Sequence, residues 1–169
     1  MSVLYIQSSI TLITDIQDFL VNNDAKFKEV WNTELKLYRP LVSLPSKSLF
    51  TIFESSNPNR VYIVTDSGVT LAGTEMRPII ETRLKKTWMT RQTFRGRGYV
   101  YECEDNGLLR ICNVTVQGGY KGLLIDADTN FPSTKRLLKE LADKFGLGNV
   151  PEPVDGESER ARLYEIVYK

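Results

Sequence analysis

A succession of strand-like segments without intervening helices constrains this chain more than any other feature of its sequence. Four segments rich in β-branched and aromatic residues follow one another in the second half, separated only by turn-forming residues. Parallel strands need a crossover of a dozen or more residues, usually a helix, whereas antiparallel strands are joined by short hairpins. The spacing therefore predicts antiparallel strands at residues 88–94, 99–103, 108–116 and 120–126.

The first half of the chain adds further segments of the same kind, bounded by Gly, Pro, Asn, Asp and Ser residues. These predicted strands are 3–7, 30–38, 49–54, 60–65 and 69–72. Together the segments predict a mainly β (α+β) fold, an antiparallel β-barrel of about eight strands flanked by two to four helices. The length fits a single domain that covers residues 1–169.

Apolar residues at helical spacing predict the flanking helices. The inner face of a first helix, which follows the first strand, is predicted to comprise Ile10, Ile13, Ile16 and Leu20. A second helix is predicted at residues 78–86, and a third begins at Pro132 and ends at Gly146. A flexible acidic linker at 149–159 is then expected to precede a last amphipathic helix at 159–168.

The first hairpin of the second half has two candidate registers. A two-residue Asn-Gly loop would pair Cys103 with Arg110, whereas a three-residue loop with a left-handed Gly107 would pair Glu102 with Arg110. We prefer the second register because it gathers the apolar side chains on one face of the sheet. It also places Cys103 and Cys112 on opposite faces, which predicts two free thiols.

The following hairpin gives a different buried face. A two-residue turn at Gly118-Gly119 would pair Val114 with Leu123, and the apolar face would then be the one that carries Cys112. This face is opposite to the one favoured by the preceding hairpin, so either a β-bulge intervenes or both faces of the sheet are covered. The second alternative suits a barrel that fills its interior while helices or a partner cover its outside.

The composition removes several kinds of chemistry. The chain has no histidine and two cysteines, so it cannot form a Ser–His–Asp relay, a Cys–His relay or a zinc site built from histidine or four cysteines. Its 22 basic and 21 acidic residues leave a net charge of +1, which gives no reason to expect a nucleic-acid or membrane surface. Catalysis by carboxylates, lysine or a bound metal ion stays open, so the composition makes an enzyme less expected without excluding one. We predict that the protein is not an enzyme and uses no cofactor or metal.

Two motifs leave other functions open. Glu102 and Glu104 place two carboxylates at strand spacing, as in the tunnel-type triphosphatases, which bind a divalent cation inside a barrel; Asn106 stands where those enzymes have a lysine. An arginine cluster with aromatic neighbours at 91–97 is compatible with binding of single-stranded RNA. The simpler interpretations are a solvated hairpin end for the glutamates and a polar turn with an exposed strand face for the arginines.

Several short strings in the second half occur in an order and spacing that are found together in one family. They are W-M-T-R-Q at 88–92, Arg95-Gly96, Y-x-Y at 99–101, L-R-I at 109–111, N-V-T-V at 113–116 and G-Y-K-G-L-L-I at 119–125. In this arrangement the chain resembles subunit 20 of the Mediator complex in its fungal form. The strings T-D-I-Q-D-F-L at 14–20 and R-L-Y at 162–164 also lie where that family has them.

The resemblance implies a noncatalytic, nuclear part of the Mediator head module, built as a barrel with flanking helices. It implies a heterodimer with Mediator subunit 18, a tether through the C-terminal segment of subunit 8, and an indirect role with the RNA polymerase II initiation machinery. It implies no membrane partner and no small-molecule substrate. Aromatic and arginine side chains are typical of binding hot spots. The interface is accordingly predicted at Trp88, Arg91, Phe94, Tyr99 and Tyr120.

Overall fold

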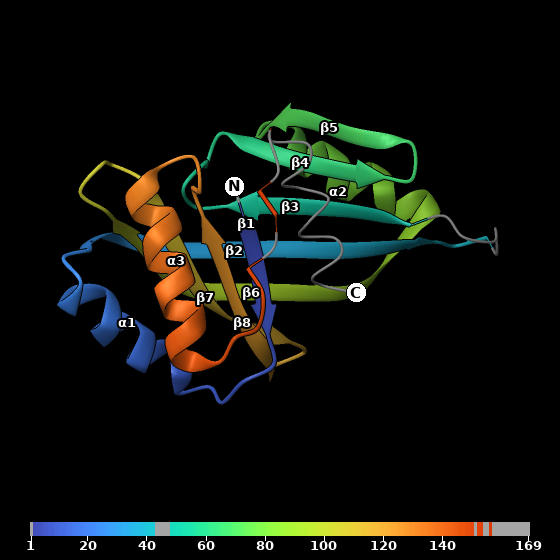
Figure 1. Cartoon of the computed structure of the whole chain (residues 1–169). Coiled ribbons are helices and arrows are strands. Elements are labelled where there is room, and N and C mark those ends of the chain that lie inside the picture. Colours follow the sequence, from blue (N-terminus) through green and yellow to red (C-terminus); the bar gives the residue numbers. More distant parts are fainter. Residues whose placement is uncertain (1, 43–47, 151, 154–155, 157–169) are drawn as a thin grey trace.

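The structure, a computed structural model, describes residues 2–42, 48–150, 152–153 and 156. In this part of the chain, eight strands form one antiparallel sheet and three helices pack around it (Figure 1). In chain order the elements are β1 (Ser2–Ile6), α1 (Leu12–Asn22), β2 (Lys26–Pro40), β3 (Leu49–Glu54), β4 (Arg60–Thr65), β5 (Gly68–Gly73), α2 (Met76–Thr87), β6 (Trp88–Glu102), β7 (Leu108–Val116), β8 (Gly119–Ala127) and α3 (Pro132–Phe145). None of these helices is long and apolar enough to span a membrane.

The mainly β, antiparallel fold predicted from the sequence is confirmed, and the sheet is curled but open. The strand order is β1-β8-β7-β6-β2-β3-β4-β5, so β1 and β5 form its two edges. The curl is visible in the packing, because one buried cluster joins Val3 of β1 to Tyr62 and Val64 of β4. The sheet is therefore barrel-like without closing.

The segment from residue 88 to 102 is a single strand, not the two strands predicted on either side of Arg95–Gly98. β6 pairs with β2 along the whole length of both, and each strand has 15 residues. The glycines that suggested a turn face the inner side of the curl instead. A Cβ at Gly98 would overlap the Ile111 carbonyl oxygen and the Cys112 backbone, so only glycine fits where β6 passes β7.

Both faces of the sheet are buried at β1, β7 and β8, as one of the two alternatives for the hairpins required. On the outer face, α1 and α3 cover β1, β7 and β8; this outer cluster includes Leu4, Ile16, Leu20, Tyr101, Leu109, Ile111, Leu123, Ile125, Leu138 and Leu141. The inner cluster fills the curl and comprises Val3, Trp31, Leu35, Phe50, Ile52, Tyr62, Val64, Phe94, Val100, Cys112, Val114 and Leu124. Neighbouring residues of β7 thus belong to different clusters.

The β6–β7 hairpin has neither of the two predicted registers. Glu102 lies opposite Leu108 and Arg110 lies opposite Val100, so the predicted pairing of Glu102 with Arg110 is wrong. The Cys103 amide donates a hydrogen bond of 2.9 Å to the Gly107 carbonyl, so the loop has the three residues that the preferred register predicted, but they are 104–106 instead of 105–107. The left-handed residue is accordingly Asn106, with φ of 65°, and not Gly107. The preferred register differs from the observed one by two residues, which leaves each side chain on the same face.

The two cysteines confirm the assignment of faces. Cys103 belongs to the outer cluster and Cys112 to the inner one, and both are free and buried. Burial is the main cause that raises the pKa of both thiols above the ordinary value. They are therefore core residues in the neutral thiol form.

The β7–β8 hairpin turns one residue earlier than predicted. Gln117 and Gly118, not Gly118 and Gly119, occupy the turn, with φ of 51° and 79°. Val114 therefore lies opposite Gly122 rather than Leu123, and a bulge separates Val114 from Thr115. The bulge and the double coverage, which were considered as alternatives, both occur.

The three described helices were all predicted: α3 begins at Pro132 as expected, and α2 is longer than the predicted 78–86 at both ends. α1 begins at Leu12, later than expected, and Ile10 is 55% exposed instead of buried. α3 ends at Gly146, whose φ of 63° is left-handed as a helix stop requires. Asp105 of the β6–β7 turn accepts a hydrogen bond from the Ser133 backbone amide at 2.8 Å and so caps the start of α3. The predicted helix at 159–168 lies outside the described residues, as does most of the predicted linker.

Candidate functional site

The five residues predicted as an interface do not form one patch. Phe94 is 2% exposed and belongs to the inner cluster. Trp88 is half-buried and Arg91 is exposed at one end of β6, whereas Tyr99 is half-buried toward the other end. Eleven residues of strand, about 36 Å, separate Trp88 from Tyr99. Tyr120 lies near the start of β8, where its hydroxyl hydrogen-bonds a serine that follows β1.

Trp88 and Arg91 lie beside exposed apolar side chains at one end of the β2–β6 pair. We call the residues around this end the end patch: Leu41, Val42, Trp88, Met89 and Arg91. Because successive strand residues such as Trp88 and Met89 point to opposite faces, the end patch lies around the end of the pair and not on a single face. The exposed fractions are 51% for Leu41, 72% for Val42 and 53% for Met89. The Leu41 amide donates a hydrogen bond of 2.9 Å to the carbonyl of the last residue of α2, which holds the segment against β6. Exposed apolar groups gathered in this way are typical of interaction surfaces.

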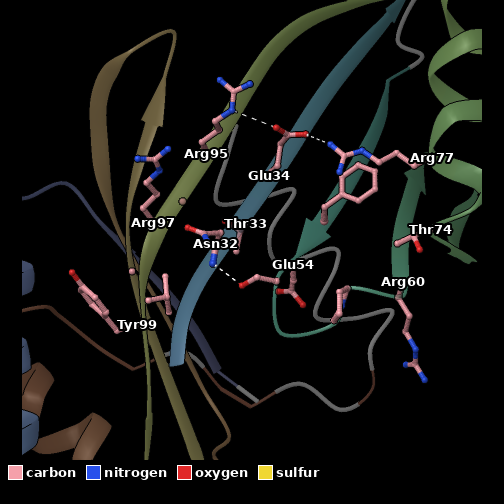
Figure 2. Close-up of a pocket in the computed structure, with 16 residues that line it drawn as sticks. Asn32, Thr33, Glu34, Glu54, Arg60, Thr74, Arg77, Arg95, Arg97 and Tyr99 are labelled. Atoms are coloured by element: carbon pink, nitrogen blue, oxygen red, sulfur yellow. Dashed lines mark hydrogen bonds and ion pairs between the residues drawn. The ribbon is translucent and has the colours of Figure 1, made fainter. Parts of the chain in front are cut away.

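A groove of about 770 Å³ forms a second surface, on the outer face of β2, β3 and β6 (Figure 2). It lies beyond the part of the outer face that α1 and α3 cover, and Arg77 of α2 contributes to its wall. Its floor consists of three cross-strand pairs in succession. Moving along β6 from Tyr99, the paired residues are Val30 with Tyr99, Asn32 with Arg97, and Glu34 with Arg95.

The Glu34 carboxylate binds two arginines at one end of the groove, which we call the charged end. Glu34 Oε1 lies 3.1 Å from Arg77 Nη2, and Glu34 Oε2 lies 3.3 Å from Arg95 Nε (Figure 2). The Arg77 guanidinium also stacks on the Phe53 ring, 4.1 Å from its centroid. These contacts join α2 to β2, β3 and β6, so they fix the shape of this wall.

A neighbouring pair continues this network. Lys36 Nζ lies 3.2 Å from Glu81 Oε1 on α2. The hydrogen bond from Lys36 is the main cause that lowers the pKa of the Glu81 carboxyl. None of the described α2 side chains is fully buried, and Ile80 and Leu84 are half-buried, so these polar contacts add to a limited apolar contact with the sheet.

Sequence reasoning singled out Arg95, Arg97 and Tyr99, but it missed the residues that complete the groove. Glu34 and Arg77 come from elements far apart in the chain, and no local pattern links them. The alternation of Arg95, Arg97 and Tyr99 at every second position was the available signal. It indicates one strand face once the segment is recognised as continuous.

The residues that suggested other functions are in different surroundings. Glu102 forms an ion pair with Lys28 at 2.9 Å, and Glu104 is exposed in the turn beyond β6. Arg110, which was expected beside these glutamates, is buried and lies 3.2 Å from Asp128. In the described part of the chain, no cluster of His, Cys, Asp and Glu could hold a metal ion.

The chain is similar to known proteins in sequence. A family model described as the TATA-binding related factor of subunit 20 of the Mediator complex matches residues 2–161. The Mediator of RNA polymerase II transcription subunit 20 of Candida glabrata is 25% identical, over 89% of this chain and 82% of that protein. The corresponding subunit of Yarrowia lipolytica is also 25% identical, over 69% and 72%.

Solved structures with a similar fold share little sequence with it. A putative adenylyl cyclase from Hippeastrum, HpAC1, described as having a dominant triphosphatase activity, aligns with a TM-score of 0.55 and 11% identity, over 96% of this chain and 94% of that one. The PH1012 protein of Pyrococcus horikoshii aligns with a TM-score of 0.53 and 15% identity, over 90% and 95%. At such identities the likeness concerns the fold alone. The sequence match over nearly the whole described chain identifies the family: the chain belongs to the Mediator subunit 20 family.

Proposed function

We propose that this chain is a noncatalytic subunit of the Mediator head module that acts in the nucleus as the partner of Mediator subunit 18. In this role it contributes to the regulation of transcription initiation by RNA polymerase II. The C-terminal segment of subunit 8 reaches it mainly through subunit 18. Membership of the Mediator subunit 20 family supports the assignment to the complex.

The packing of the inner face supports the proposal that the subunit is noncatalytic. Trp31, Leu35 and Phe94 fill the curl, each at most 2% exposed. A tunnel enzyme needs this space for its substrate and for the acidic side chains that hold a cation. Here the two glutamates that suggested such a site lie at a hairpin end. Arg110 and Asp126 alternate with residues of the outer cluster and so face inward, where both are buried and lie 3.7 Å apart as an ion pair. This filled interior supports a scaffold, whose partner would bind on the outside of the sheet.

The end patch is the surface that we assign to subunit 18. Trp88 and Arg91 are residue types that are enriched in binding hot spots, and the other three residues add exposed apolar area around them. The end patch lies where the long β2–β6 pair ends, beside the last residue of α2. A stable interface buries about 800 Å² on each partner, so the patch would form the centre of a larger contact.

Co-purification with subunit 18 of the same organism tests the pairing. The two chains are co-expressed, and a one-to-one complex is expected by size exclusion with light scattering. The double variant Leu41→Asp/Met89→Asp introduces two carboxylates into the patch and is expected to abolish the complex. Ile10→Asp is the matched control, because Ile10 is equally exposed at 55% but lies away from the patch. A chain that remains monomeric beside subunit 18 would refute the pairing.

An assay of phosphate release from a nucleoside triphosphate tests the noncatalytic assignment separately. The purified chain with Mg²⁺ or Mn²⁺ is expected to release none above the buffer control. Activity that is present in the wild type and absent in Glu102→Gln would show that the chain is an enzyme instead.

A further inference from the structure

The groove on the outer face of β2, β3 and β6 has no role in the pairing proposed above. We propose that it is a binding site for an extended peptide segment of a partner protein, with acidic side chains at two alternate positions and an apolar side chain at the next. This inference concerns a different surface from the end patch and does not depend on the identity of subunit 18.

The spacing of the floor residues points to an extended ligand. The three pairs of the floor succeed one another at every second residue of β6, so their side chains repeat about every 6.6 Å. An extended peptide presents side chains to one side with the same repeat, whereas a helix does not. Its successive contacts would be Arg95, Arg97 and the Val30–Tyr99 pair.

The charges in the groove favour an acidic ligand. Four arginines line it, and only two carboxylates do. Glu54 is 3% exposed, and Glu34 is already shared between Arg77 and Arg95. Arg97 is exposed and forms no side-chain hydrogen bond or ion pair with any residue that the structure describes. A guanidinium fork in this position is suited to bind a carboxylate.

The other end of the groove favours an apolar side chain. Val30 is 55% exposed opposite Tyr99. Phe27, 56% exposed, lies edge-on to the Tyr99 ring with 6.2 Å between centroids. These side chains form an exposed apolar surface next to the arginines, and aromatic residues at such a surface anchor an apolar group well.

Glu34 argues against a polynucleotide in the same place. Its carboxylate lies in the centre of the charged end, where a phosphate backbone would meet it. A peptide carboxylate can bind the terminal nitrogens of Arg95, because Glu34 contacts this guanidinium through Nε, and the uncharged positions beside that carboxylate can lie over Glu34. We therefore favour the peptide and treat single-stranded RNA as the competing outcome.

Fluorescence anisotropy with two labelled peptides tests the proposal. Both carry the pattern Asp-Thr-Asp-Thr-Phe, one in each chain direction, and a third peptide of equal composition places the two Asp residues side by side. At least one of the alternating peptides is expected to bind the full chain saturably below about 1 mM, the weak end of specific association. Its affinity should fall with salt and exceed that of the third peptide.

Two variants locate the site. Arg97→Glu reverses the exposed charge and is expected to weaken binding about three- to tenfold, the range of one or two lost ion pairs. Val30→Asp removes the apolar contact and is expected to weaken it to a similar degree. Arg39→Glu is the matched control, because Arg39 is exposed on the same sheet and outside the groove. Circular dichroism confirms that each variant is folded.

Four results would overturn the proposal. The first is that no peptide binds saturably, and the second is that Arg97→Glu and Arg39→Glu weaken peptide binding equally. The third is that an oligouridine binds more tightly than the peptides at moderate salt. The fourth is that a peptide binds only after acidic residues of the chain itself have been neutralised. The last is tested with Asp155→Asn, Glu157→Gln and Glu159→Gln together, because these residues also alternate. Subunit 18 is absent from the assay, so the result is independent of the proposed pairing.

Discussion

Replacement of Gly98 by alanine tests how closely β6 and β7 approach one another. The added Cβ would meet the Ile111 carbonyl oxygen and the Cys112 backbone, which cannot rotate away as a side chain could. Trp31, opposite Gly98 on β2, is fully buried and leaves no room on the other side. Overpacking of a tight core costs about 1–3 kcal/mol, and the backbone contacts place this variant at the upper end, about 3 kcal/mol.

Thermal unfolding followed by circular dichroism measures this loss. About 3 kcal/mol corresponds to a Tm lower by roughly 6–12 °C for a domain of this size. Gly68→Ala is the control, because a Cβ there meets nothing within 4 Å. This variant should be more stable by about 0.4–1 kcal/mol, because alanine lowers the conformational entropy of the unfolded chain. If the two variants melted at the same temperature, the close approach of β6 and β7 would be refuted.

Three further predictions concern the core and the α3 cap. Phe94→Ala is expected to cost about 3–5 kcal/mol in urea unfolding, because its ring is buried in the inner cluster; a cost below about 1 kcal/mol would contradict that placement. Cys103 and Cys112 should react with Ellman's reagent only after unfolding, since burial raises the pKa of both thiols; rapid labelling of the native protein would contradict this. A hydrogen bond from the Ser133 backbone, in the first turn of α3, is the main cause that lowers the pKa of the Asp105 carboxyl, and a hydrogen bond from the Gly107 backbone adds to it. Its stabilising effect is therefore present above its ordinary pKa of about 3.9 and lost as the pH falls through the lower folded value. Asp105→Asn should melt below the wild type at neutral pH, with a difference that shrinks on acidification.

The fold class could be predicted from the sequence because strand patterns and short turns leave few arrangements. The face of each side chain in the β6–β7 hairpin was also predictable, since burial of Tyr101, Cys103 and Ile111 on one side fixes it. The register itself was not, because it depends on a left-handed Asn106 rather than on the neighbouring glycine. The continuity of β6 was missed for a related reason. Glycine is the strongest local signal for a turn, whereas Gly98 is required by close packing inside a strand.

The candidate surfaces were harder to predict than the fold. Residue type alone selected Phe94 and Tyr99 together, but their odd separation in one strand places them on opposite faces. The groove also depends on Glu34 and Arg77, which meet only after β2 and α2 have packed. Such contacts between distant elements have no signature in a single sequence.

β2 and β6 pair from end to end, and the register shifts at two points, between Phe27 and Glu29 and between Leu37 and Tyr38. The end patch includes residues 88–91 of β6 and the groove includes residues 95–99, so the same pair of strands positions both surfaces. The rise of about 3.3 Å per strand residue sets their separation, and the register shift between Leu37 and Tyr38, where the pairing skips Arg91, lies between them. A ligand that bound both surfaces would therefore also hold this irregular point of the ladder in one geometry. Two ligands on these sites would be held in fixed geometry, and a single flexible partner could span both only with a linker of matching length.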